Sequence, residues 1–557
     1  MNLESAKLTK LPPYWRGVTL NHRGKFDAVE PYFFDTETCE GEVYTLFFQE
    51  RKKKTKVFYG RDLNYLNLFF EEVKTALSKE TLPVFCAHRL RFDLEVLFWD
   101  ILKPLNKVRR APQHSHFTYL PYKATVKIFW GRPCFGEIVI DGRKCRLIDT
   151  MSFFPMSLGA AIEAVGGKYE KKPKPKGLGT KFLSEKIIID YGLNDVRGGM
   201  EVLEEILKLH IKYDLQICVS LPQVASRIFR HKFLKKDFTR PSPILQVMSL
   251  LSYHGGKNSF PAKKVGWYKG VTDLDIKSAY PFAMKNLPDF ENGKWVKTDK
   301  LEEHGIYKVE GLIKPCKWGC LFSPDFKKLS GKIKTYATSY EIKAGIELDH
   351  LKINKLSGYY FKEKKTQEKT ALTRYVEYFY QKKEEEKNKG QKTLYKMLLN
   401  SLYGKFIQRN EDEETGDMIA GAMFDPSVAS LITGFTRAQI HYLEHRYDAI
   451  HTATDGIITK KEIDPCDLGS ELGKLEIKSK GDAFIVRNKL YSIFNSKTGE
   501  LIKFAAHGFL GSISELMDLT AKKEKIYEAS RMSSWREAWH TLERPGVMRK
   551  IKTILNY

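Results

Sequence analysis

The sequence lacks any run of about 18 apolar residues, the shortest stretch that crosses a membrane as a helix. The segment from Met1 to Pro13 contains no apolar core of a secretory signal. Eight cysteines in 557 residues do not form a disulfide framework, and no second pair joins Cys316 and Cys320 to complete a zinc site. We therefore expect a cytoplasmic protein without a membrane partner.

Acidic residues are scarce relative to basic ones, 68 against 93, which leaves a net charge of +25. Such an excess suits a polyphosphate partner, because neutralised phosphates release their counterions. The basic residues cluster, and the 28 tyrosines and 34 phenylalanines offer stacking surfaces for unpaired bases. Charge can serve solubility alone, but the clusters favour nucleic acid: 51–54, 171–176 and 362–365.

The chain mixes strand-like and helical patterns, which predicts an α/β protein of several domains. Four apolar runs in the first part predict strands at 32–34, 84–86, 138–140 and 145–148. A helix about 191–210 ends this part and is followed by an apolar helical stretch from about 213 to 252. Residues 384–390 predict a turn between two antiparallel helices, and the last fifty residues a small separate unit.

A first group of acids lies in the N-terminal part. Asp35 and Glu37 follow an apolar run and share one face of a strand, Asp93 follows another run, and Tyr191 and Asp195 are one helical turn apart. Each acid alone is more readily a cap or a surface charge. Together, four acids would hold two Mg²⁺ ions, because like charges this close are unfavourable without a cation.

A second group begins with Asp273 and Asp275, which share a strand face, so that spacing alone leaves open which of them binds metal. Residues 449–458 predict two strands joined at Asp455-Gly456, a strong hairpin signal that is more often structural than catalytic. Between these segments, the apolar spacing of 396–404 predicts a helix. On its polar side lie Lys392, Lys396, Asn400 and Tyr403. Snorkelling lysines on a core helix are the alternative interpretation.

The first group resembles the three motifs of DEDD-type 3′→5′ exonucleases. The resemblance implies that Asp35, Glu37, Asp93 and Asp195 bind metal and that Tyr191 orients the attacking water. Arg89 stands where protein-primed relatives carry an asparagine that contacts DNA or terminal protein. The lysine of the third motif stays open among three candidates: Lys168, Lys171 and Lys172.

The second group resembles motifs A, B and C of family B DNA polymerases. The pattern Asp-x-x-Ser-x-Tyr-Pro selects Asp275, with Asp455 as its partner in metal binding and Tyr280 under the incoming sugar. The resemblance also implies that Lys392 and Lys396 hold the triphosphate. By the same resemblance, the remaining residues contact the nascent pair or the DNA: Asn400, Tyr403, Tyr253, Gly255, Gly256, Lys489 and Tyr491.

Motif C departs from the family pattern Asp-Thr-Asp-Ser, because Ala453 replaces the first acid and Gly456 replaces the serine. We expect weaker metal binding or an altered metal preference. The long segment after Tyr280 matches the insertion that docks terminal protein, whereas only 408–425 is available for the second insertion, which helps to encircle DNA in relatives. This shortness predicts poorer helicase-free processive synthesis.

The resemblance as a whole implies a protein-primed family B DNA polymerase with an RNase H-like exonuclease domain followed by a right-hand polymerase domain. It would use two Mg²⁺ or Mn²⁺ ions per active site and act as a monomer on DNA template and primer, dNTPs and a terminal protein. Two alternatives remain: an exonuclease with an impaired polymerase half, and an oligonucleotide-primed polymerase. The expected domains are 1–212 (exonuclease), 213–285 (palm), 286–361 (insertion), 362–407 (fingers), 408–426 (second insertion), 427–510 (palm) and 511–557 (thumb).

Overall fold

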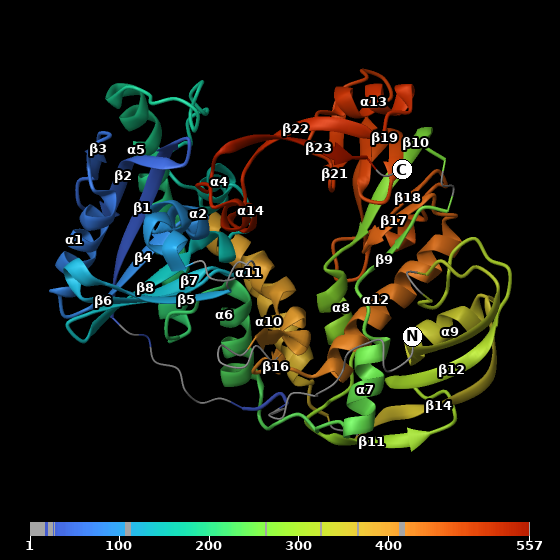
Figure 1. Cartoon of the computed structure of the whole chain (residues 1–557). Coiled ribbons are helices and arrows are strands. Elements are labelled where there is room, and N and C mark those ends of the chain that lie inside the picture. The colour runs from blue at the N-terminus through green and yellow to red at the C-terminus, as the bar shows by residue number, and fades with distance from the viewer. Residues whose placement is uncertain are drawn as a thin grey trace.

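The computed structural model describes residues 17–20, 26, 28–105, 113–261, 264–323, 326–364, 367–411 and 418–555. The prediction on Met1 to Pro13 lies outside these residues, as do parts of the second insertion and of the lysine cluster 362–365. Within them, no helix is both long and apolar enough to span a membrane. Figure 1 shows the N-terminal domain on the left, most of the other elements on the right, helices between the two, and a C-terminal segment that reaches from the right to the left.

The N-terminal domain is built on an eight-stranded sheet of order β3-β2-β1-β4-β8-β7-β6-β5. Strand β1 carries apolar side chains on both faces, so Phe33 packs in the core on the side of helix α5 and Phe34 in the core beside helix α1. All four predicted strands and the helix about 191–210 are confirmed. The elements are β1 (Val29–Cys39), β2 (Glu42–Glu50), β3 (Lys56–Tyr59), α1 (Tyr65–Leu77), β4 (Leu82–Ala87), α2 (Leu90–Leu97), α3 (Trp99–Leu102), β5 (His114–Tyr119), β6 (Ala124–Phe129), β7 (Phe135–Ile140), β8 (Arg143–Asp149), α4 (Leu158–Val165) and α5 (Glu185–Lys212).

A second, antiparallel sheet of seven strands, the central sheet, has the order β21-β20-β19-β10-β18-β17-β9. Its middle strand β10 leads directly into helix α8, and the long helix α12 also packs against the sheet (Figure 1). The elements are β9 (Lys257–Ser259), β10 (Gly266–Ile276), α8 (Ala279–Lys285), α12 (Pro426–Arg446), β17 (His451–Thr454), β18 (Gly456–Thr459), β19 (Leu475–Arg487), β20 (Leu490–Phe494) and β21 (Leu501–Ala506).

Helices connect the two sheets. The antiparallel pair α10 (Ala371–Glu385) and α11 (Lys389–Ser401) confirms the predicted turn about 384–390. The single helical stretch predicted from 213 to 252 is wrong: it divides into α6 (Leu221–Ile228), a π-helical turn to Phe233, and α7 (Pro243–Ser252). Proline at positions 241 and 243 prevents a continuous helix, since it lacks the N–H donor.

Three smaller units complete the fold. A four-stranded sheet with α9 (Ser339–Glu347) lies in the predicted insertion: β11 (Gly293–Thr298), β12 (Gly305–Ile313), β13 (Gly331–Thr338) and β14 (Leu351–Glu363). A short hairpin, β15 (Arg409–Glu411) and β16 (Met418–Ala420), occupies the second insertion. The C-terminal unit comprises α13 (Ile513–Lys522), β22 (Ile526–Met532), α14 (Trp535–Thr541) and β23 (Met548–Ile554).

The sequence analysis predicted a separate C-terminal unit, and this prediction is wrong. Ala538 and Trp539 of α14 are buried in a core of the N-terminal domain. The prediction failed because the sequence of a seven-residue helix does not tell which distant surface receives its apolar side chains.

Candidate functional sites

The structure brings the first group of acids together into what we call the N-terminal acid site: Asp35, Glu37, Asp93 and Asp195. Asp35 and Glu37 project from β1, and Asp93 from α2 accepts hydrogen bonds from the backbone N–H of Thr36 at 3.1 Å and its hydroxyl at 2.8 Å. Asp195 comes from α5 and is 2% exposed. Tyr191 lies one turn before it on the same helix.

The N-terminal acid site concentrates negative charge in a buried place. Burial, followed by the repulsion of Asp195, raises the pKa of Asp35 to about 7. Burial and then Asp35 raise the pKa of Glu37 and of Asp93 well above the ordinary range. Oδ1 of Asp195 is buried and has no hydrogen-bond partner. These buried oxygens are hard ligands of the kind that Mg²⁺ prefers, so the residues fit the predicted metal.

One of the three candidate lysines reaches the N-terminal acid site. Lys171 forms an ion pair with Asp195, and its ammonium lies 5.0 Å from the centre of the Tyr191 ring. Lys172 instead pairs with the exposed Asp190, and the backbone N–H of Lys168 donates to Glu201. Geometry therefore selects Lys171, which spacing alone left open, because the loop before α5 folds back over that helix.

Arg89 precedes helix α2 with a φ of +76°, in the left-handed region, and its backbone N–H donates to Asp149 at 3.0 Å. An asparagine, which stands here in the family pattern, would adopt this conformation more easily. The Arg89 side chain is exposed.

The second group of acids meets in the central sheet. Asp275 at the end of β10 pairs in register with Gly456 of β18, and Asp455 precedes that glycine in the turn from β17. The backbone N–H of Ile276 donates to the carbonyl of Asp455 at 2.8 Å. Burial, followed by the repulsion of Asp275, raises the pKa of Asp455 to about 6. We call Asp275 and Asp455 the central acid site.

The predicted hairpin is confirmed, but its turn differs from the prediction. Ala453 pairs with Gly456, so the turn residues are Thr454 and Asp455, and Thr454 adopts a φ of +63°. Gly456 is required for space, since a Cβ there would lie 2.2 Å from Oδ1 of Asp275. Gly456, which stands where the family pattern has serine, therefore leaves room for the Asp275 carboxylate.

The structure separates Asp275 from Asp273. Nζ of Lys503 lies 2.5 Å from Oδ2 of Asp273, which is 3% exposed, so this acid is committed to an ion pair. Among the described residues, the one ion pair of Asp275 is with Lys478, at 3.9 Å, and Lys478 lies nearer to Glu476, at 2.7 Å. Sequence analysis missed Lys503 and Lys478, because their strands carry no motif that marks them.

Helix α11 presents Lys392 and Lys396 as exposed side chains, and the amide of Asn400 donates to the carbonyl of Lys396 at 2.8 Å. The helix ends at Ser401, so Tyr403 lies in the following 3₁₀ turn rather than on the helix as predicted. In that turn, the Tyr403 ring stacks on the ring of Tyr280 of α8, with centroids 4.0 Å apart and an interplanar angle of 15°.

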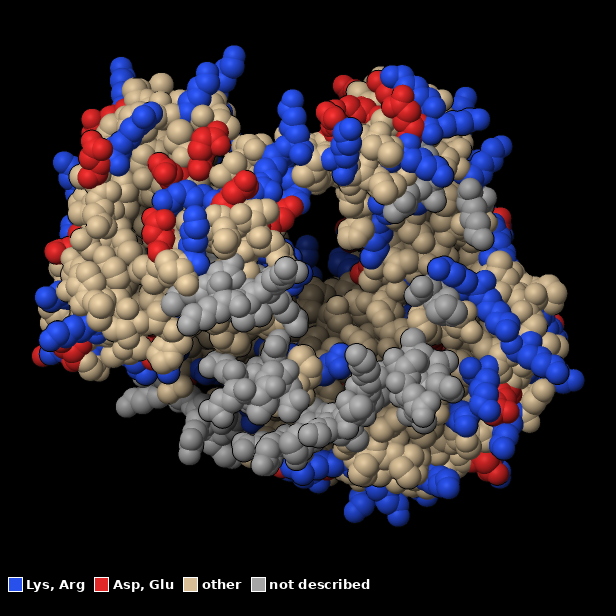
Figure 2. Space-filling view, in the orientation of Figure 1, with Lys and Arg blue, Asp and Glu red and all other residues tan. Residues whose placement is uncertain are grey.

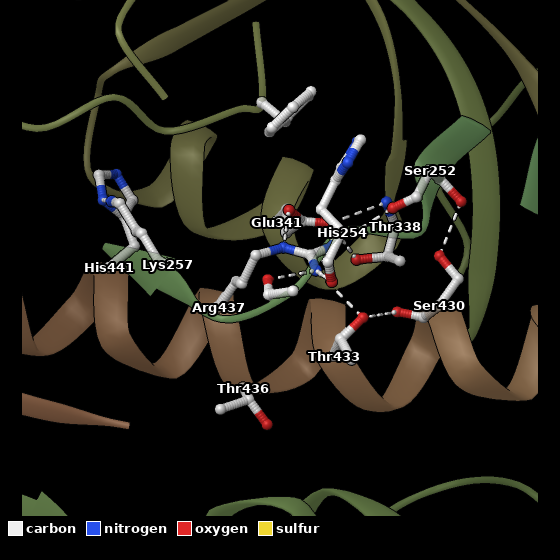
Figure 3. Close-up of polar contacts among 12 residues, drawn as sticks. Ser252, His254, Lys257, Thr338, Glu341, Ser430, Thr433, Thr436, Arg437 and His441 are labelled. Atoms are coloured by element: carbon white, nitrogen blue, oxygen red, sulfur yellow. Dashed lines mark hydrogen bonds and ion pairs between the residues drawn. The ribbon is translucent and has the colours of Figure 1, made fainter. Parts of the chain in front are cut away.

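Gly256 follows Tyr253 and Gly255 and packs on the central acid site, since a Cβ there would lie 2.8 Å from Cα of Thr454. Figure 3 shows how this segment is held: the buried Arg437 of α12 donates to the carbonyl of His254 at 2.5 Å. Arg437 also forms a buried ion pair with Glu341 of α9, at 2.8 Å. Sequence analysis missed both residues of this pair.

Lys489 and Tyr491 lie beyond strand β19 in the central sheet, on the side of β10 opposite to β18. Lys489 sits in the β19–β20 turn with a φ of +59°, and its charge acts to lower the pKa of Asp455. Tyr491 is 5% exposed, with its ring 5.0 Å from that of His451. Of the two, Lys489 is the more accessible to a ligand.

Within the described ranges, no three His, Cys, Asp or Glu side chains form a ready metal-binding group. At the central acid site only two acids converge, because Ala453 contributes none. At the N-terminal acid site, Asp195 is turned towards Lys171. In both places the carboxylate oxygens nevertheless fit a hard divalent cation.

Comparisons of sequence support the predicted resemblance. Residues 168–419 match the family described as DNA polymerase type B, organellar and viral. A DNA polymerase of Acidianus bottle-shaped virus (isolate Italy/Pozzuoli) is 28% identical over 281 residues, 47% of this chain and 41% of the relative. A DNA-directed DNA polymerase of Enterobacteria phage PRD1 is 24% identical over 460 residues, 69% of this chain and 80% of the relative. The chain thus spans less than half the length of the first relative.

Comparisons of structure confirm the fold class. Phi29 DNA polymerase complexed with primer-template DNA superposes with a TM-score of 0.67 and 15% identity, over 95% of this chain and 100% of that one. The ternary complex of the same polymerase with primer-template DNA and incoming nucleotide gives a TM-score of 0.65 and 16% identity, over 95% of this chain and 99% of that one. In sequence and fold the chain resembles the type B DNA polymerases of viruses, with an RNase H-like domain followed by a right-hand polymerase domain.

Proposed function

We propose that the chain is a DNA-templated DNA polymerase that extends a primer at the central acid site and removes 3′ nucleotides at the N-terminal acid site. The observation that carries the proposal is the register of Asp275 with Gly456, which sets Asp275 beside Asp455 near the stacked rings of Tyr280 and Tyr403. The alternative of a silenced polymerase half finds less support, because Gly456 accommodates the Asp275 carboxylate.

The residues divide the work of nucleotidyl transfer. The exposed Lys392 and Lys396 would neutralise the triphosphate, and Tyr280 would lie under the sugar and exclude a ribose 2′-hydroxyl. Asp275 and Asp455 would hold Mg²⁺ or Mn²⁺, which lowers the pKa of the primer hydroxyl and neutralises charge on the phosphates.

At the N-terminal acid site, the four acids would hold the same ions, and Tyr191 would orient the attacking water. Burial raises the pKa of Asp195, and the attraction and the hydrogen bond from the Lys171 ammonium oppose this rise.

The first experiment is extension of a labelled primer on template DNA with Mg²⁺ and then Mn²⁺, with and without dNTPs. We expect growth with dNTPs and shortening without them. Shortening under every condition would contradict the polymerase and leave a nuclease on a polymerase-shaped scaffold.

We further propose initiation on a terminal protein, supported by the four-stranded sheet β11–β14 that lies in the predicted insertion. The test incubates the chain with a candidate terminal protein and a labelled dNTP. Covalent label on that protein is expected. Extension of oligonucleotide primers without such an adduct would favour the oligonucleotide-primed alternative.

A further inference from the structure

The tip of the C-terminal hairpin is anchored in the N-terminal domain, far from it in sequence. Trp539 of α14 is 4% exposed, and Ala538 is fully buried. Both belong to the apolar core that surrounds helices α1 and α2. Burial of a tryptophan at a contact between two domains is typical of a specific interface, because aromatic residues dominate interface energetics.

Polar and backbone contacts surround this anchor. Nη2 of Arg544 lies 3.0 Å from both carboxylate oxygens of Asp100, a bifurcated ion pair, and Nε lies 3.6 Å from Glu42. A Cβ at Gly41 would lie 2.6 Å from the carbonyl oxygen of Pro545, so the two backbones approach closely. The backbone contact thus lies beside the buried Trp539, whereas the Asp100 and Glu42 side chains are exposed.

The base of the same hairpin belongs to the other side of the molecule. Tyr527 of β22 and Leu555 after β23 pack in one core with Phe484 and Leu490 of the central sheet. The hairpin therefore bridges the central sheet and the N-terminal domain, which the chain also connects through helices α5 and α6 (Figure 1). Figure 2 shows the hollow that lies between these parts, with basic side chains on its rim.

One face of the hairpin is not covered by any of the residues that the structure describes. Ser530 and Lys550 face each other across the strands, as do Glu528 and Lys552, and all four residues are exposed. The same face carries the exposed side chains of Ile526, Met532, Met548 and Ile554, and its two lysines outnumber its one acid, so its middle can contact a phosphate backbone. The hairpin β15–β16 is short by contrast, so β22–β23 is the longer arm over the hollow.

We propose that α14 is a clasp: its docking on the N-terminal domain closes a protein ring around the primer–template duplex. The inference rests on the proposed function for the identity of the DNA. Closure of the ring would then come from this contact rather than from the short second insertion. A closed ring leaves DNA only over a free end or by undocking α14.

The test measures the lifetime of the full chain on a fluorescent primer–template that carries biotin at both ends. Streptavidin is added after loading, and excess unlabelled DNA then captures every protein that dissociates. For the wild type we expect streptavidin to lengthen the lifetime several-fold. Arg544→Asp and Trp539→Ala should abolish this lengthening, and Asp100→Arg combined with Arg544→Asp should restore it.

Arg536→Asp on the exposed side of α14 is the matched control and should retain the lengthening. Equal wild-type lifetimes with and without streptavidin, or an unchanged effect in Arg544→Asp, would overturn the clasp. The readout needs no nucleotide incorporation. A chain that shows the lengthening but makes no DNA therefore refutes the proposed polymerase and not the clasp.

Discussion

The N-terminal and central acid sites hold carboxylates in different surroundings. The first gathers four acids from three elements in a buried place and keeps an ammonium, that of Lys171, against one of them. The second uses two half-buried acids, Asp275 on β10 and Asp455 in the turn before β18, and the nearest ammonium among the described residues, that of Lys478, stays 3.9 Å away. Negative charge is therefore offset in part by a lysine at the first site and left to ligands at the second.

Removal of the acids is the strongest test of whether the two sites carry separate activities. Asp275→Ala and Asp455→Ala should abolish primer extension and spare shortening, whereas Asp35→Ala should do the reverse, because each site holds its own metal ions. Both activities are measured on one labelled primer–template. Extension at the wild-type rate by Asp455→Ala would show that the metal assignment is wrong.

The next prediction concerns the space beside Asp275. Gly456→Ala should lower the rate of extension by about 10²-fold, because the new Cβ displaces the carboxylate and a shift of about 1 Å costs that much. Gly456→Ser, which restores the family residue, should be no better. Shortening by the same protein serves as the internal control, and a wild-type rate of extension would refute the steric argument.

Lys171 and Lys478, one beside each acid site, provide a matched pair of variants. Lys171→Ala should lower the rate of shortening by about tenfold or more, because burial then raises the pKa of Asp195 without the opposing cation. Lys478→Ala should change extension by less than about threefold, since exposed pairs are worth little. Similar losses in both variants would mean that the sites do not differ in charge balance.

The smallest effect is expected in the stability of the metal-free protein. The pKa of Asp35 is about 7 in the folded chain, above its ordinary value, so the folded state binds more protons between those values. The unfolding temperature should therefore fall by a few degrees as the pH rises from about 4 to about 7. Asp35→Asn should reduce this dependence, as measured by thermal unfolding in chelator. A dependence identical to that of the wild type would contradict the assigned pKa.

Local patterns carried much of the prediction. Period-two and helical spacing located β1, β4 and α5, and the order of short motifs identified the acids of both sites. Spacing failed where a side chain's partner is distant in sequence. It could not choose between Asp273 and Asp275, because that choice depends on Lys503, more than two hundred residues away.

The sequence by itself determined the class of fold, the positions of the acids and the excess of positive charge, because these depend on local spacing and composition. Only the tertiary structure decided that Lys171 serves the N-terminal acid site, that Gly456 makes room for Asp275, and that Trp539 closes on the N-terminal domain. Each of these is a contact between segments far apart in the chain. Such contacts are set by how whole elements pack, and no local pattern records them.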